Sequence, residues 1–313
     1  MQHVLIVGAT GRLGRHLVDR LLAQGDVVSA LVRQDPRGDP SRRSLLDRFR
    51  TRGVKLMAGA LEDEASLEVA CRGVDAVVSC VDHRPDHLRL QANLAKAAAQ
   101  AGSVRRILPS QFGIDSRLYG QARVDHGDLK RELQQVFIDS GVPTTFVHIN
   151  GLASAWVGCL GQLGLSAPPA HEVEVYGDGT VRFSTVAPED VARYATRALA
   201  DFRTRNRHVT IAPPQNRLTQ LELIALWEAK SGARLRRRFV SPQALDARIE
   251  ALAQDPAQRP QLAMAQLVRA AWIDGLGDGR RLPDAIELSE LYPEIDYRRP
   301  VEYLERYLPA QTA

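Results

Sequence analysis

Apolar positions along the first half of the chain follow a strand–helix rhythm. Residues 4–7 (VLIV) form a continuous apolar run, typical of a strand buried on both faces, and leucines recur at helical spacing after it. The same reasoning predicts strands at residues 26–32, 54–57, 75–81, 104–108 and 144–149, and helices at residues 62–72, 88–101 and 129–139. Strands joined by helices of this length indicate a parallel sheet covered on both faces.

The pattern changes after Asn150. Residues 151–170 (GLASAWVGCLGQLGLSAPPA) are too apolar for a linker and too rich in glycine for a stable long helix. This segment is either a mobile wall beside a ligand cavity or a crossover between subdomains. Further helices are expected at residues 188–200, at residues 219–232 and around residues 262–271.

These elements predict the fold class and the domain organisation. We expect an α/β chain with a Rossmann-type, doubly wound parallel sheet and a smaller, mostly C-terminal substrate-binding subdomain. The sheet should occupy residues 1–150, with parts of residues 180–215 returning to it, and the subdomain residues 151–313.

Composition narrows the choice of partners. Hydrophobic residues make up 44% of the chain and charged residues 25%, as in ordinary globular proteins. No stretch is long and apolar enough to span a bilayer, and the N-terminus lacks the features of a signal peptide, so we expect a cytoplasmic protein without a membrane partner. The net charge of +4 is dispersed and aromatic residues are only 5%, which argues against nucleic acid and favours an anionic cofactor.

The pattern of cysteines and histidines predicts no metal site. Cys71, Cys80 and Cys159 match neither a zinc nor a redox motif, and no set of His, Cys and Asp has metal-ligand spacing. His148 lies within a predicted strand, and we expect it to be a hydrogen-bonded core residue.

A glycine-rich loop, residues 8–14 (GATGRLG), lies between the first strand and the first helix. Glycines at this point let the backbone turn sharply and approach a pyrophosphate, which the helix N-terminus also attracts. The spacing is GxxGxxG, and its strand–loop–helix context makes it a strong signal of dinucleotide binding. The expected cofactor contacts in the loop are Gly8, Thr10, Gly11, Arg12, Leu13 and Gly14.

The end of the second strand indicates which dinucleotide binds. An acidic residue there suits the ribose hydroxyl of NAD, whereas arginine accommodates the 2′-phosphate of NADP. The strand ends in Arg33, with Arg37, Arg42 and Arg43 nearby, and Asp35 is the one competing acid. We therefore expect NADPH as the cofactor.

Lysine is rare in this chain, which makes Lys130 a candidate for chemistry. Of 41 Lys and Arg residues, only those at positions 55, 96, 130 and 230 are lysines. Lysine can lose its proton in a suitable environment and arginine cannot, so Lys130 is either a proton-transfer group or a residue on a solvated helix face.

At this point several motifs resemble those of one family. GATGRLG, residues 105–113 (RRILPSQFG), residues 188–191 (PEDV) and residues 290–293 (ELYP) are similar to the isoflavone-reductase-like, or NmrA-like, atypical short-chain dehydrogenases. Gln111 stands where that family commonly has glutamate. The similarity runs nearly from end to end, and it implies a reductase that needs no metal.

The resemblance implies that Lys130 is the catalytic base, by alignment back from Gly141, Val142 and Pro143. If Asp128 caps the helix, Lys130 lies in the first turn, where the helix dipole and a bound apolar substrate both favour the neutral amine. Asp125 and Asp128 would oppose this. No Tyr-x-x-x-Lys pair exists, because Tyr119 is followed by Arg123.

Other site residues are expected around the ends of the strands. Val81 and Asn150 should complete the cofactor site with Lys130, while residues 82–84 offer backbone contacts rather than side-chain catalysis. His126 either lines the pocket or is an exposed loop residue. The expected substrate contacts are Phe112, His126, Leu152, Trp156 and Arg269, the last at a position where lignan-acting relatives often carry histidine.

Together with the predicted NADPH site, the resemblance implies an NADPH-dependent reductase of phenylpropanoid-derived aromatics, acting by cleavage of the benzylic ether of a furofuran lignan such as pinoresinol. Two alternatives stay open: an isoflavone or other phenolic reductase of the same family, and a non-catalytic NADP-sensing regulator. The expected partners are a small phenolic substrate and a second copy of the chain in a homodimer.

Overall fold

A parallel sheet forms the centre of the molecule in the computed structural model, which describes residues 1–33, 39–120, 124–278 and 282–308. In spatial order its strands are β3 (Lys55–Ala58), β2 (Val27–Val32), β1 (His3–Val7), β4 (Ala76–Ser79), β5 (Arg106–Leu108), β6 (Thr145–His148), β10 (Arg207–Thr210) and β13 (Ile286–Glu287). A single bridge between Ile107 and Thr144 joins β5 to the β6 part of the sheet. The first six strands have the order of a dinucleotide-binding Rossmann sheet.

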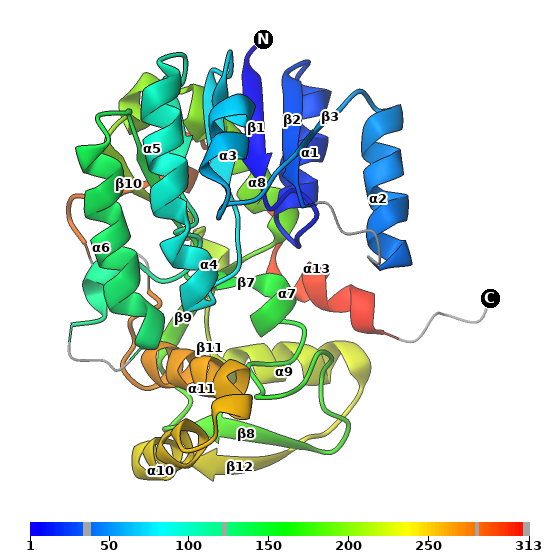
Figure 1. Ribbon diagram of the computed structural model, residues 1–313. Coiled ribbons are helices and arrows are strands. Elements are labelled where there is room, and N and C mark those ends of the chain that lie inside the picture. Colours follow the sequence, from blue (N-terminus) through cyan, green and yellow to red (C-terminus); the bar gives the residue numbers. More distant parts are fainter. Residues whose placement is uncertain (34–38, 121–123, 279–281, 309–313) are drawn as a thin grey trace.

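Helices cover both faces of this sheet, as Figure 1 shows. One face carries α1 (Gly14–Ala23), α2 (Pro40–Thr51) and α8 (Pro188–Ala200), and the other carries α3 (Glu64–Cys71), α5 (Gln91–Ala101) and α6 (Asp125–Asp139). A short helix, α4 (Pro85–Arg89), precedes α5. The two layers confirm the predicted doubly wound α/β fold.

The apolar run of β1 serves both layers. Val4 and Ile6 pack into the core beneath α1 and α8, whereas Leu5 and Val7 pack into the core beneath α3 and α5. Successive side chains of a strand point to opposite faces, so a strand covered on both sides must be apolar at every position.

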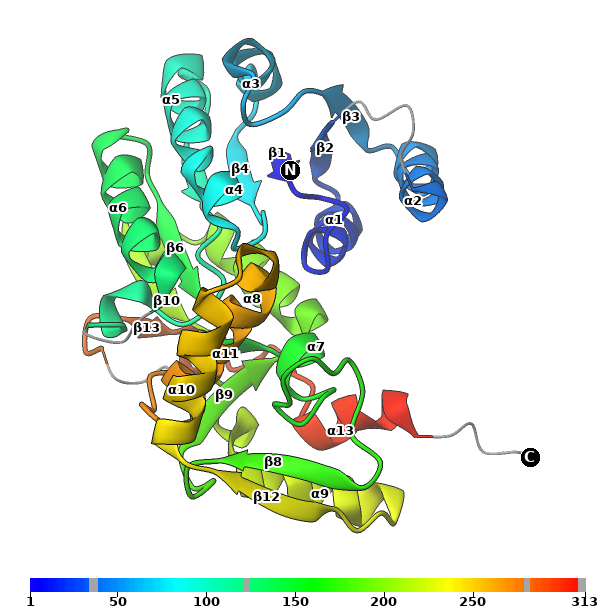
Figure 2. The same ribbon diagram turned by 60° about the horizontal axis from the view of Figure 1, so that its bottom comes forward.

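The second half of the chain adds a smaller layer below the carboxyl ends of the central strands (Figures 1 and 2). Its strands are β7 (Gly151–Leu152), β8 (Glu172–Tyr176), β9 (Arg182–Val186), β11 (Arg217–Thr219) and β12 (Arg236–Val240). Its helices are α7 (Ala153–Trp156), α9 (Gln220–Ser231), α10 (Pro242–Ala253), α11 (Arg259–Trp272) and α13 (Pro300–Leu304), while α12 (Leu288–Leu291) packs against α8. Short 3-10 helices lie at Ser116–Leu118, Phe202–Thr204, Pro214–Asn216, Pro256–Gln258 and Glu305–Tyr307.

The chain crosses between the two layers more than once. It leaves the central sheet after β6 and enters β7 three residues later. Strand β7 pairs with β9 of the lower layer. It then returns, because α8 packs on α1 and β10 pairs with β6. The domain boundary at residue 150 stays a prediction. Among the described residues, no helix has the length and apolar character needed to cross a membrane.

Candidate active site

The glycine-rich loop is tightly folded against the end of β4. Gly8 has a φ of +86°, and a Cβ placed on it would lie 2.7 Å from the carbonyl oxygen of Cys80. A Cβ on Gly14 would collide with the carbonyl oxygen of Gly8. Helix α1 begins here without a side-chain cap and without an acid in its first turn. Its first N–H groups therefore point toward the place where an anionic pyrophosphate would bind.

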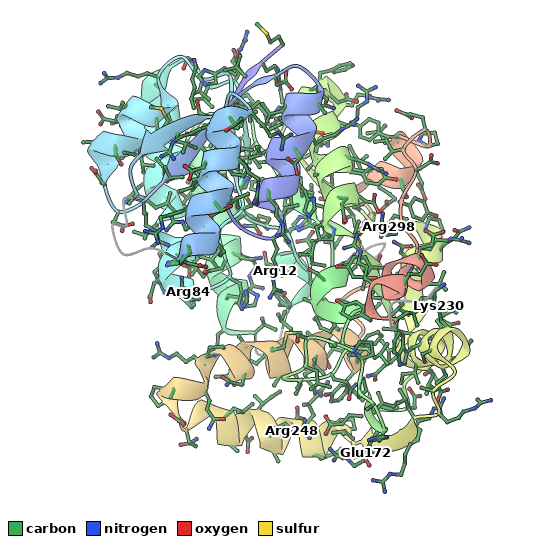
Figure 3. All side chains as sticks on the ribbon, turned by 90° about the vertical axis from the view of Figure 1, so that its right-hand side faces the viewer. Arg12, Arg84, Glu172, Lys230, Arg248 and Arg298 are labelled. Carbon is green, nitrogen blue, oxygen red and sulfur yellow. The ribbon has the colours of Figure 1, made fainter. Side chains whose placement is uncertain are left out.

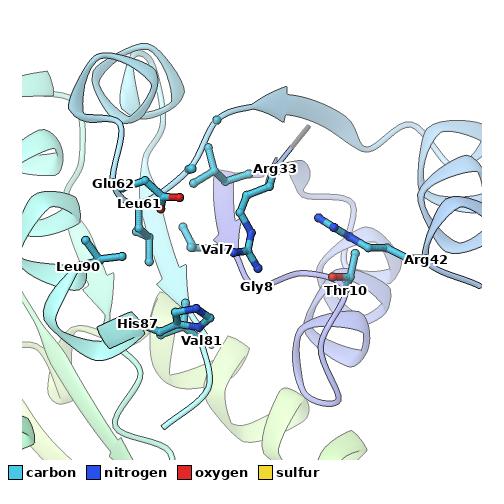
Figure 4. A pocket seen from close by; sticks show the side chains of 13 residues that line it. Val7, Gly8, Thr10, Arg33, Arg42, Leu61, Glu62, Val81, His87 and Leu90 are labelled. Atoms are coloured by element: carbon cyan, nitrogen blue, oxygen red, sulfur yellow. The ribbon is translucent and has the colours of Figure 1, made fainter. Parts of the chain in front are cut away.

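Two arginines converge on one cavity of about 190 Å³ beside this loop. Figure 4 shows Arg33, at the end of β2, and Arg42, on α2, extending toward each other next to Thr10. The Nε atom of Arg42 is buried without a hydrogen-bond partner. Among the described residues, neither guanidinium forms an ion pair, so both are available to a phosphate group.

The other arginines of the predicted cluster are placed differently. Arg43 lines a neighbouring cavity of about 360 Å³ together with Arg33 and Arg42. Arg12 is exposed on the glycine-rich loop, at the level where the two layers of the molecule face each other (Figure 3). Arg37 and the competing Asp35 lie outside the described residues.

A cleft of about 540 Å³ connects the loop with Lys130. From the predicted cofactor and substrate sets, its lining includes Gly8, Thr10, Gly11, Arg12, Leu13, Arg33, Val81, Phe112, Lys130 and Leu152. His83, Ser110 and Ile149 line it as well, although the sequence did not point to their side chains. One continuous cleft therefore holds the phosphate loop and the candidate base.

Lys130 lies in the second turn of α6, not in the first. The N-cap residue is Val124 and the helix starts at Asp125, so the expectation that Asp128 caps the helix is wrong. The side chain is only 5% exposed, and among the described residues Nζ has neither a hydrogen-bond nor an ion-pair partner. Burial lowers the pKa of Lys130 to about 8, and the charge of Asp115 opposes this shift. The lowered pKa of Lys130 is thus caused by desolvation and not by the helix dipole, and it allows the amine to be neutral.

Buried amide groups hold the backbone of Lys130. The Gln111 side chain donates to the Lys130 carbonyl oxygen at 3.1 Å, and Gln134 donates to Gln111 Oε1 and to Ser116 Oγ at 3.3 and 3.0 Å. An ionised glutamate at position 111 could not make the first contact, because it has no proton to donate. The departure from the family motif at this position is therefore accommodated by the local hydrogen bonds.

Asn150 lies two residues after β6, between Ile149 and Leu152 of the cleft lining, and is not itself among the residues that line the cleft. Its φ of +55° is unusual for a residue other than glycine, and its N–H donates to the Gly113 carbonyl oxygen at 3.1 Å. The Nδ2 atom is buried without a partner. The predicted cofactor contact of Asn150 therefore stays a prediction.

The predicted substrate residues are only partly brought together. Trp156 packs against Phe183 and Trp272, with ring centroids 4.4 and 6.2 Å away. Arg269 is held by ion pairs with Asp246 at 2.8 Å and with Asp274. Neither residue lines the described cleft, unlike Phe112 and Leu152.

His126 is not an exposed loop residue. It lies on α6, one turn before Lys130, with 4% of its surface exposed. Its ring centroid is 5.6 Å from that of His83 and 6.2 Å from that of Tyr119. Burial and the Lys130 charge lower the pKa of His126 to about 3, so the imidazole is neutral.

A polar cluster that the spacing of His, Cys and Asp along the sequence does not predict is formed by residues of three separate segments. The ligand atoms of Asp115, His148 and His208 lie within 4.8 Å of one another. Arg117, however, donates to both Asp115 oxygens at 3.1 Å, and His148 Nε2 lies 3.1 Å from His208 Nδ1. These hydrogen bonds account for the contacts without an ion. His148 is also less satisfied than expected, because its buried Nδ1 has no partner.

Comparison with known proteins identifies the family. The NmrA-like family profile matches residues 1–304. Pinoresinol reductase 1 of Arabidopsis thaliana is 33% identical over 311 residues, which cover 97% of this chain and 96% of that one. The solved structure of AtPrR2 with NADP+ and (+)-pinoresinol has a TM-score of 0.89, 32% identity and coverage of 98% and 99%. A binary complex of leucoanthocyanidin reductase with NADPH from Vitis vinifera has a TM-score of 0.86, 28% identity and coverage of 97% and 99%. As its motifs predict, the chain belongs to the NmrA-like family.

Proposed function

We propose that this protein cleaves the benzylic ether of a furofuran lignan such as pinoresinol by reduction. The chain is an NADPH-dependent oxidoreductase of the NmrA-like family, as the sequence predicts. The observation that supports the reaction is a buried lysine with a lowered pKa in the same cleft as the dinucleotide loop. A structural relative that holds NADP+ and pinoresinol supports the substrate class.

The residues present fit NADPH. Gly8 and Gly14 lack side chains where a Cβ would meet backbone atoms, so the loop can fold tightly between β4 and the start of α1, as the turn that binds a pyrophosphate requires. Arg33 and the unpartnered Nε of Arg42 suit the 2′-phosphate, whose oxygens accept charge-assisted hydrogen bonds. Val81 lines both the cavity of these arginines and the cleft that holds Lys130, so it would contact the cofactor.

Lys130 performs the proton transfer in this proposal. Its neutral amine removes the proton from the para-phenol of the substrate, and the phenolate expels the benzylic ether oxygen to leave a quinone methide. Bound NADPH supplies the hydride that the benzylic carbon needs. Lys130 then returns its proton to the phenolate as the ring becomes aromatic again. Phe112 and Leu152 provide apolar walls for the aromatic ring.

An NADPH-consumption assay with pinoresinol, lariciresinol, an isoflavone and a simple quinone tests the proposal. We expect oxidation of NADPH with the lignans, identified by the ring-opened product. Turnover of the isoflavone and of no lignan would favour the alternative that the protein is an isoflavone or other phenolic reductase of the same family. Tight NADPH binding without turnover of any phenolic compound would favour the non-catalytic regulator.

A further inference from the structure

The proposed reaction needs a proton that Lys130 does not supply. Cleavage breaks one C–O bond and forms one C–H and one O–H bond, so the substrate gains a hydride and a proton. Lys130 borrows the phenolic proton and gives it back to the same oxygen. The expelled alkoxide therefore has to receive a different proton, and its ultimate source is the solvent.

We propose that His83 delivers this proton from solvent to the leaving oxygen, and that His126 positions the His83 ring. This inference rests on the proposed function. His83 lines the same cleft as Lys130, yet it is exposed at the surface, so its ring can reach both a bound substrate and water. An alkoxide is basic enough to take the N–H proton of a neutral imidazole while the other ring nitrogen takes a proton from water.

The surroundings of His83 favour this neutral relay. The groups that act on its ring are Lys130 and Arg84, which are cationic, Asp82, which is anionic, and the neutral His126. Desolvation first, and then the Lys130 charge, lower the pKa of His83 below its usual value. A neutral imidazole has one donor and one acceptor nitrogen, which is the form that passes a proton through the ring.

His126 fixes the His83 ring from the side of α6. The ring centroids of His83 and His126 are 5.6 Å apart with an interplanar angle of 50°, and the His126 ring also lies edge-on to Tyr119, with centroids 6.2 Å apart. A Cβ added to Gly127 would lie 2.6 Å from the Tyr119 ring, so this packing depends on a glycine next to His126. His126 and Lys130 are four residues apart on one helix and therefore lie on the same face. His83 and Lys130 are thereby kept at two places in one cleft. A para-hydroxybenzyl ether requires this, because the base acts on its phenolic oxygen and the acid on its ether oxygen.

The test compares two substrates that differ only in their leaving group. A 4-hydroxybenzyl alkyl ether expels a strongly basic alkoxide, whereas 4-hydroxybenzyl 4-nitrophenyl ether expels a weakly basic phenolate that needs no proton. His83→Gln should lower kcat for the alkyl ether by about 10²–10⁴-fold and leave that for the nitrophenyl ether within roughly tenfold. Lys130→Met should slow both ethers. Added imidazole should restore part of the rate of His83→Ala with the alkyl ether.

Two further variants complete the experiment. His126→Phe keeps a ring against His83 and should retain most of the kcat for the alkyl ether, whereas His126→Ala should lower it. His171→Gln, at an exposed histidine that lines none of the described cavities, should behave like the wild type. If His83→Gln lowers kcat equally for both ethers, or does not lower it for the alkyl ether, the role of His83 is overturned while the proposed function stands. A wild type that reduces neither ether would overturn the proposed function and this inference with it.

Discussion

At the scale of residues, a buried amine is the base of the proposed reaction. The pKa of Lys130 is lowered to about 8 because burial penalises the ammonium form, and no described acid forms an ion pair with it. A general base acts in its neutral form, so kcat/KM for pinoresinol should rise as the pH increases through about 8 and level off above it. A rate that is flat from pH 6 to 10 would contradict this assignment.

Replacement of Lys130 separates proton transfer from electrostatics. Lys130→Met should lower the rate of lignan reduction by about 10²–10⁴-fold with little change in the Kd for NADPH, because the loop and the arginines hold the phosphates. Lys130→Arg should fail almost as completely, since arginine keeps its proton. A rate restored by arginine would mean that only a positive charge is required at this position.

Arg42 should decide the preference for NADPH. Its Nε is buried without a partner, and its side chain lines the cavity that Arg33 also lines. Charge-assisted hydrogen bonds to the 2′-phosphate should contribute about 1.5–3 kcal/mol, so Arg42→Ala should weaken NADPH binding roughly ten- to a hundredfold. The Kd for NADH should stay unchanged. Arg48→Ala, on the same helix but bonded to Ser44, is the matched control.

At the scale of elements, the first part of the glycine-rich segment after β6, residues 151–162, forms a packed wall rather than a loose loop. Gly158 lies against the Tyr307 ring and Gly161 against Trp272, while Cys159 and Leu160 are buried. Only Leu152, at its start, lines the cleft. We therefore expect amide hydrogen exchange at residues 151–156 to slow when NADPH and pinoresinol bind together. Residues 157–162 should be protected already in the free protein, and fast exchange there would indicate a mobile lid.

Most elements of the first half could be predicted because their periods are clear, and so could the long helices α8, α9 and α11 of the second half, whereas the short strands of the lower layer could not. Strand β12 (RRRFV) is exposed at four of its five residues, so it shows no apolar alternation, and its partner β8 is only five residues long. Helix α2 was missed because its only buried residue is Phe49. The site shows the same contrast. The glycine-rich loop is local in sequence, whereas the burial of Lys130 and the meeting of Asp115, His148 and His208 depend on segments far apart.

At the scale of the whole molecule, cofactor and substrate share one cleft, which predicts an order of binding. The cleft runs from Gly8 and Leu13 to Lys130 and Leu152, so a bound dinucleotide would form part of the surface on which an aromatic ring lies. NADPH at a hundred times its Kd should stabilise the fold by about 2.7 kcal/mol, seen as a rise in Tm. Pinoresinol alone should raise Tm much less, and it should add to the rise once NADP+ is present.

The same titration on the double variant Arg33→Ala and Arg42→Ala shows whether the phosphate site is the origin of this coupling. At an unchanged NADPH concentration the rise in Tm should shrink, because stabilisation by a ligand depends on the ratio of its concentration to its Kd. The further rise caused by pinoresinol should shrink with it, since fewer molecules then hold the dinucleotide. If pinoresinol raises Tm as much in this variant, or in the wild type without any dinucleotide, the substrate site is complete in the protein alone. The cleft would then consist of two independent sites, and Leu152 and Phe112, rather than the bound cofactor, would provide the surface for the aromatic ring.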